Sequence, residues 1–235
     1  MKRTVVAVAL MSIGLSAAQA QEVVVKLGGA APLTGNQSHL GKDLENGTRL
    51  AIEEANAKGV TIGGKKVKFE LVGEDDQADP RTGTTVAQRL VDAGVKGVIG
   101  HLNSGTSIPA SRIYDQAGIP QVSPASTNPK LTLQNFSGVF RTIANDVQQG
   151  TGLGKYATGP LGAKRVAIID DRTAYGQGLA DETAKAVKET GGEVVAREFT
   201  TDKATDFNAI LTKIRATNAE VVFYGGMDAQ AGPMV

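Results

Sequence analysis

The sequence predicts an α/β fold in which each of two lobes is built on a doubly wound, mostly parallel sheet. From Glu22 onward, apolar runs of strand length alternate with segments of helical period. After Phe140 the same alternation starts again, so two series are joined near residues 141–146. Strands that alternate with helices indicate right-handed crossovers, and these produce parallel sheets.

The first series contains predicted strands at 23–29, 67–71, 97–100 and 119–122. A helix between the first two has one apolar face made of Leu44, Gly47, Ala51 and Ala55. Asp79 and Pro80 form an N-cap and first-turn pair that starts the next helix. A third helix is predicted at 108–116.

The second series contains predicted strands at 165–170, 193–199 and 221–224, with helices at 147–156 and 179–189. A third helix has an apolar face at i, i+3, i+4 and i+7, made of Phe207, Ile210, Leu211 and Ile214. Three strands are fewer than the four to six that sheets usually contain. We therefore expect the second lobe to be incomplete and the chain to be a piece of a longer polypeptide.

The N-terminus predicts export. Lys2 and Arg3 precede an apolar stretch at 5–15, and Ala18-Gln19-Ala20 matches a small-residue cleavage site. The apolar stretch is too short for a membrane anchor. We expect a signal peptide at 1–20, a first lobe at 21–142 and a truncated second lobe at 143–235.

Composition excludes several classes of function. Removal of the signal peptide takes two of the 25 basic residues away against 24 acidic ones, which leaves a formal charge of −1. A nearly neutral chain gives no electrostatic basis for binding nucleic acid or a membrane surface. The absence of cysteine excludes disulfides and thiolate chemistry. His39 and His101 lack metal-site spacing and are interpreted as polar loop residues, so we expect no metal and no cofactor.

Three motifs that resemble catalytic sites fail on their context. Residues 59–66 approach a phosphate-binding loop, but Lys66 stands where Ser or Thr is needed, so a hairpin turn is expected there. The glycine-rich stretch at 150–159 follows no strand, so it is not a dinucleotide-binding fingerprint. Asp75 and Asp76 are interpreted as a solvated acidic loop. No nucleophile elbow or Ser-His-Asp order is present, and the sequence therefore predicts a protein that is not an enzyme.

Two polar segments, "HLNSGTS" (101–107) and "SPASTN" (123–128), follow neighbouring predicted strands. Taken alone, each serine is more simply a helix cap or a solvated hydroxyl. In open parallel sheets, however, ligands bind outside the carboxyl ends of the strands. Hydroxyls and backbone amides delivered there by two strands suit a carboxylate, and the Ala125 carbonyl can accept from an ammonium group.

The segments 100–132, "DRTAYGQGLA" (171–180) and "VVFYGGMDAQAGP" (221–233) resemble the periplasmic leucine/isoleucine/valine-binding proteins of ABC transporters. The similarity runs from about Glu22 to the last residue. It implies a type I periplasmic binding protein fold, whose two lobes are joined by a hinge and close on an amino acid.

The resemblance also implies roles for individual residues. Ser104 and the Thr127 amide would hold the ligand carboxylate. The Ala125 carbonyl and the Thr127 hydroxyl would hold its ammonium group. Tyr175 would close over the ligand from the second lobe.

This chain departs from well-known members of that family at several positions. Leu40 and Met227 stand where those members have aromatic residues, and both are expected to flank the ligand side chain. Ala78 and Asn103 stand at the positions of two bridged cysteines, and Asn103 is counted among the ligand-binding candidates. The acidic partner of the ammonium group would lie beyond residue 235.

These observations together predict a periplasmic, monomeric solute-binding protein that captures branched-chain amino acids and delivers them to a membrane permease. The alternatives are a ligand-sensing module of the same fold that regulates a partner protein, a protein that binds another amino acid or an amide, and a doubly wound enzyme such as a sugar or nucleotide transferase. An enzyme would need an acid–base pair or a phosphate loop, and the sequence offers neither.

Overall fold

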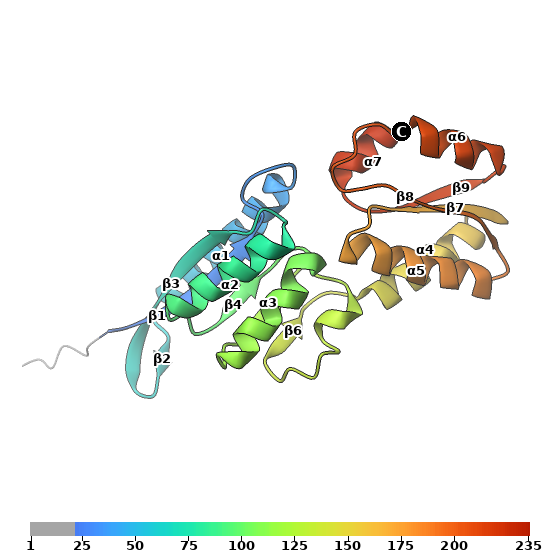
Figure 1. The fold of residues 1–235 in the computed structure, drawn as a ribbon. Helices are drawn as coiled ribbons and strands as arrows, with labels where there is room; N and C mark the ends of the chain where they lie inside the picture. The colour runs from blue at the N-terminus through green and yellow to red at the C-terminus, as the bar shows by residue number, and fades with distance from the viewer. Residues whose placement is uncertain (1–21) are drawn as a thin grey trace, which may run out of the picture.

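A computed structural model describes residues 22–235 as two lobes, each built around its own sheet (Figure 1). The first sheet has the strand order β2-β3-β1-β4-β5-β6, and the second has the order β8-β7-β9. All strand pairs are parallel except β2 with β3. The predicted α/β fold class is confirmed, whereas the predicted signal peptide lies outside the described residues.

The strands of the first lobe are β1 (Val23–Ala31), β2 (Thr61–Ile62), β3 (Lys65–Asp75), β4 (Val98–Gly100), β5 (Gln121–Ser123) and β6 (Val139–Arg141). Its helices are α1 (Ser38–Lys58), α2 (Pro80–Asp92), α3 (Ser104–Gln116) and a short 3-10 turn (Pro129–Leu131). The second lobe contains β7 (Arg165–Asp170), β8 (Glu193–Phe199), β9 (Val221–Gly225), α4 (Asp146–Thr158), α5 (Ala174–Glu189), α6 (Asn208–Ala216) and α7 (Asp228–Met234).

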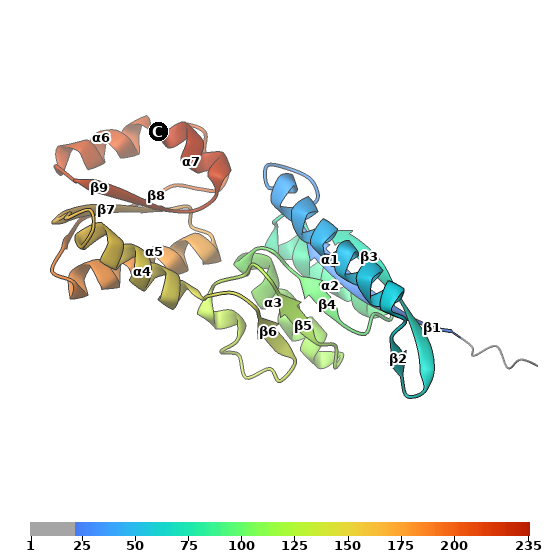
Figure 2. The same cartoon turned by 180° about the vertical axis from the view of Figure 1, so that it is seen from behind.

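Helices cover both faces of the first sheet. Helix α1 lies on one face, and α2 and α3 lie side by side on the other (Figures 1 and 2). The core beneath α2 and α3 includes Leu90 and Tyr114, both fully buried. Helix α2 begins as predicted, because the Asp79 side chain accepts hydrogen bonds from the backbone N–H groups of Arg81 and Thr82. This packing fixes the start of α3 at the carboxyl ends of β4 and β5.

The second lobe is organised around β7, its central strand. The four residues Val166, Ala167, Ile168 and Ile169 are each 0% exposed, so both faces of the strand are buried. One face packs under α4 and α5, and the other under α6 and α7 (Figure 1). The lobe is thus a layered α/β unit built on only three strands.

Several elements differ from their predicted bounds. Helices α3 and α5 begin at Ser104 and Ala174, about one turn earlier than the apolar periodicity indicates. Their first turns consist of small and polar residues, which carry no hydrophobic period. Strand β6 was not predicted. The hairpin at 59–66 is confirmed, since Thr61 pairs with Lys66 in antiparallel register.

A buried polar network lies beneath the carboxyl end of β4. His101 Nδ1 lies 2.7 Å from Asp76 Oδ2, and His101 Nε2 lies 3.0 Å from the Tyr114 hydroxyl. All three side chains are fully buried. His101 lies in the loop directly after β4, as interpreted, but it is buried there. The interpretation of Asp76 as solvated is wrong, because Asp76 and His101 satisfy each other's polar groups away from water. His39 lies on α1 near Asp228 of α7, a helical position and not the predicted loop.

Within residues 22–235, no helix is both long enough and apolar enough to cross a membrane.

We expect Gly154→Ala to lower the free energy of unfolding by about 1–3 kcal/mol, the range for an overpacked contact. A Cβ atom on Gly154 would lie 2.5 Å from that of Ala186 on α5 and 3.0 Å from the Thr183 backbone oxygen. Gly152→Ala is the matched control on the same helix, because its Cβ would meet nothing within 4 Å. That control should stabilise by roughly 0.5–1 kcal/mol. Urea unfolding of both variants measures the difference, and equal effects would show that α4 and α5 do not pack this closely.

Tyr114→Phe should destabilise the protein by about 1–3 kcal/mol, because it leaves a nitrogen of the buried His101 ring without its partner. Tyr156→Phe on α4 is the control, since Tyr156 is 56% exposed, and its effect should stay within about 0.5 kcal/mol. Thermal unfolding monitored by circular dichroism compares the two. Equal stability of both variants with the wild type would contradict the network.

Candidate functional site

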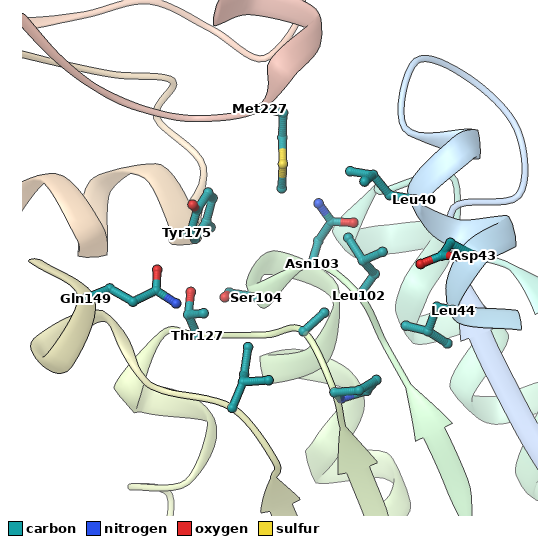
Figure 3. A pocket seen from close by; sticks show the side chains of 13 residues that line it. Leu40, Asp43, Leu44, Leu102, Asn103, Ser104, Thr127, Gln149, Tyr175 and Met227 are labelled. Carbon is teal, nitrogen blue, oxygen red and sulfur yellow. The ribbon is translucent and has the colours of Figure 1, made fainter. Parts of the chain in front are cut away.

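A cavity of about 480 Å³ lies between the two lobes, at the carboxyl ends of β4 and β5 (Figure 3). It is lined by Leu40, Asp43, Leu44, Leu102, Asn103, Ser104, Pro124, Ala125, Thr127, Ile143, Gln149, Tyr175 and Met227. All seven residues that the sequence singled out are in this set. The fold thus brings together residues 40 and 227, which lie far apart in the sequence.

Ser104 lies in the first turn of α3 and is 1% exposed. Its hydroxyl oxygen accepts a hydrogen bond from the Asn128 backbone N–H at 3.2 Å. An acceptor contact leaves the hydroxyl proton free to donate into the cavity. Asn103 precedes Ser104 at the N-cap position, where its amide nitrogen donates to Gln37 at 2.7 Å and its Oδ1 has no partner among the described residues.

The loop after β5 carries Ala125 and Thr127 and is fixed by serine hydroxyls. Ser123 Oγ accepts from the backbone N–H of Ser126 at 2.9 Å and donates to the His101 carbonyl at 2.8 Å. The Ser107 hydroxyl on α3 donates to the same carbonyl at 3.1 Å. These bonds tie the ends of β4 and β5 together. Thr127 is held at the cavity wall with 4% exposure, and its hydroxyl has no partner within residues 22–235.

The second lobe supplies the opposite wall. Tyr175 lies in the first turn of α5, and Met227 lies at the N-cap position of α7. Figure 3 shows Met227 extending from the second lobe toward the space beside Leu40 and Asn103. Burial raises the pKa of Tyr175, and the negative charge of Asp146 adds to this effect. The Tyr175 hydroxyl is therefore a neutral group that can donate or accept a hydrogen bond.

One side of the cavity is polar and the other is apolar. The hydroxyls of Ser104 and Thr127 lie on one side, together with the Gln149 amide (Figure 3). Leu40, Leu44 and Leu102 lie on the other side, where Asp43 is the one charged side chain labelled in Figure 3. This division suits a small molecule that has a charged or polar end and an apolar body. The described residues contain no group of three or more His, Cys, Asp or Glu side chains that could hold a metal ion.

Six lining residues were not predicted: Asp43, Leu44, Leu102, Pro124, Ile143 and Gln149. Leu44 was expected only on the apolar face of its helix. Its helical period is visible in the sequence, but the direction of that face is not. Asp43 is exposed and lies beside it on α1. Gln149 is one turn into α4 and follows Gln148, whose side chain forms the capping box with Asn145.

The sequence matches a family described as periplasmic binding protein over residues 24–235. It is 43% identical over 236 residues to an amino acid binding protein of Pseudomonas aeruginosa. The matched region covers 100% of this chain and 62% of that protein. It is 41% identical to Leu/Ile/Val-binding protein homolog 2 of Brucella abortus. That match covers 90% of this chain and 56% of that protein.

Among solved structures, the fold matches a branched-chain amino acid transporter substrate binding protein from Streptococcus pneumoniae in complex with isoleucine. The TM-score is 0.74 at 30% identity, over 85% of this chain and 56% of that one. The chain thus spans between 56% and 62% of the length of these proteins. The chain belongs to the periplasmic binding protein family, and the predicted resemblance to its leucine/isoleucine/valine-binding members is confirmed.

Proposed function

We propose that this chain is the ligand-capturing part of a solute-binding protein that binds branched-chain amino acids and delivers them to the permease of an ABC transporter. The observation that carries the proposal is the interlobe cavity, in which two strand-end loops present hydroxyls opposite a wall of leucine side chains. The names of the relatives support the same ligand class. The protein acts as a monomer in the periplasm after removal of the signal peptide.

The polar side of the cavity would bind the backbone groups of the amino acid. Ser104 retains a free hydroxyl proton, and together with the Thr127 amide it would donate to the ligand carboxylate. The Ala125 carbonyl and the Thr127 hydroxyl oxygen would accept from the ammonium group. Burial of these groups strengthens each hydrogen bond, because water competes less for it.

The apolar side would select the ligand side chain. Leu40 and Met227 approach it from opposite lobes, so ligand contact with both requires the lobes to close. Tyr175 would complete the closure. We place the boundary between the lobes at residues 142 and 143, in the segment between β6 and α4, where bending changes the width of the cavity.

Replacing Ser104 or Thr127 with Ala should weaken leucine binding by about 1.5–3 kcal/mol, or roughly 10- to 150-fold, because each change removes a hydrogen bond to a charged group. Ser111→Ala is the control on the same helix as Ser104. The Ser111 hydroxyl donates to the Ile108 carbonyl at 2.7 Å and does not line the cavity. Calorimetry on the complete gene product measures all three. Wild-type affinity in both site variants would refute the assignment.

Leucine, isoleucine and valine should compete with one another, because an apolar wall discriminates by only about 1–3 kcal/mol per methylene. Aspartate, glutamate and lysine should be rejected, since their side-chain charges would be buried without a partner. Lysine is the most demanding case, because Asp43 lies at the cavity wall. A competition assay with labelled leucine decides this. The branched-chain assignment fails if a charged amino acid displaces leucine at equal concentration.

A further inference from the structure

Asp146 is a fully buried carboxylate without a hydrogen-bond partner. It is 0% exposed, and neither Oδ1 nor Oδ2 has a partner among the described residues. It is the first residue of α4, where the chain enters the second lobe. A charge buried in this way is costly unless a cation or several hydrogen bonds compensate for it.

The groups around Asp146 are already engaged elsewhere. Arg141 is the nearby cation, but its guanidinium donates to the Asn128 carbonyl and to Thr132 Oγ1, both at 3.1 Å. The Asn128 amide nitrogen donates to the Ala174 carbonyl at 2.6 Å. No ion pair joins Asp146 to a basic side chain within residues 22–235.

The absence of a side chain at residue 178 creates the space that Asp146 occupies. A Cβ atom on Gly178 of α5 would lie 2.5 Å from Asp146 Oδ2 and 2.6 Å from Asn128 Nδ2. Asp146 is therefore enclosed between the loop after β5 and helix α5. Water reaches it poorly, so its charge acts strongly on neighbouring groups.

Asp146 is directly connected to the cavity wall through Thr127. The Asp146 backbone N–H donates to the Thr127 carbonyl at 2.9 Å. The Thr127 hydroxyl lines the cavity and, like the Asp146 carboxylate, has no settled partner in the described part of the chain. A hydroxyl has one proton to donate and two lone pairs that accept. If that proton points toward Asp146, the lone pairs point toward the ligand.

The charged and polar groups around Asp146 shift the pKa of its carboxyl in opposite directions. Burial raises the pKa of Asp146, the neighbouring Thr127 hydroxyl and Arg141 lower it, and the negative charge of Glu182 raises it further. Asp146 in turn raises the pKa of Tyr175, which lines the same cavity. A positive charge placed beside the carboxylate would favour its ionised form.

We propose that Asp146 is a positioning residue for the ammonium group of the ligand, an inference that rests on the proposed amino-acid-binding function. With ligand bound, its carboxylate would accept a hydrogen bond from the Thr127 hydroxyl, and the lone pairs of the Thr127 oxygen would then face the cavity as acceptors for the ammonium N–H. Its negative charge also balances the ammonium charge from behind the cavity wall. The ligand thus supplies the cation that the buried carboxylate lacks.

The test compares two ligands in wild-type protein and in Asp146→Asn, using calorimetry on the complete gene product. Leucine has the ammonium group, and isocaproate has the same carbon skeleton and carboxylate without it. Asp146→Asn should weaken leucine binding by about 10- to 100-fold, the range for a lost interaction with a charged group. Isocaproate should bind both proteins within about twofold, because it has no ammonium group to position.

Glu182→Gln is the matched control. Glu182 acts on Asp146 through its charge but does not line the cavity between the lobes, so leucine affinity should change by no more than about twofold. Isocaproate binding by Asp146→Asn also reports that the variant is folded. Equal losses for leucine and isocaproate would show a merely structural role and overturn the inference, as would unchanged leucine affinity. Absence of leucine binding by the wild type would instead refute the proposed function.

Discussion

The geometry of the cavity depends on one backbone carbonyl, that of His101. The hydroxyls of Ser107 and Ser123 both donate to it, one from helix α3 and one from the end of β5. A carbonyl has two lone pairs, so it can hold two segments at once. The His101 ring is itself held by Asp76 and Tyr114. The start of α3 and the loop after β5, which carry the polar wall, are both tied to the His101 carbonyl.

The second lobe achieves its arrangement through close contact between helices. Gly154 brings α4 against Ala186 of α5, and the lack of a side chain at Gly178 makes room for Asp146. A Cβ atom at either glycine would overlap a neighbouring atom of this closely packed region. The start of α5, which carries Tyr175, is consequently held against α4 within the second lobe.

The sequence alone predicts much of the fold and the main candidates at the site. Strands 165–170 and 193–199 agree with β7 and β8, because continuous apolar or alternating runs are strong signals. The first turns of α3 and α5 escape notice, since small and polar residues have no hydrophobic period. Asp76 and Asp146 show the deeper limit. A carboxylate near a turn or a helix start has the same local sequence whether it is solvated or buried, and only the tertiary packing of Tyr114 or Gly178 decides between the two.

The polar and apolar groups of the cavity are divided unequally between the lobes. Ser104, Ala125 and Thr127 all belong to the first lobe, while Tyr175 and Met227 come from the second. Under the proposed function, an incoming amino acid meets the first-lobe groups that bind its carboxylate and ammonium before the lobes approach each other. Capture is then governed by diffusion to the first lobe, and the residence time is governed by how long the second lobe remains closed. The two lobes would thus control separate rate constants of a single equilibrium.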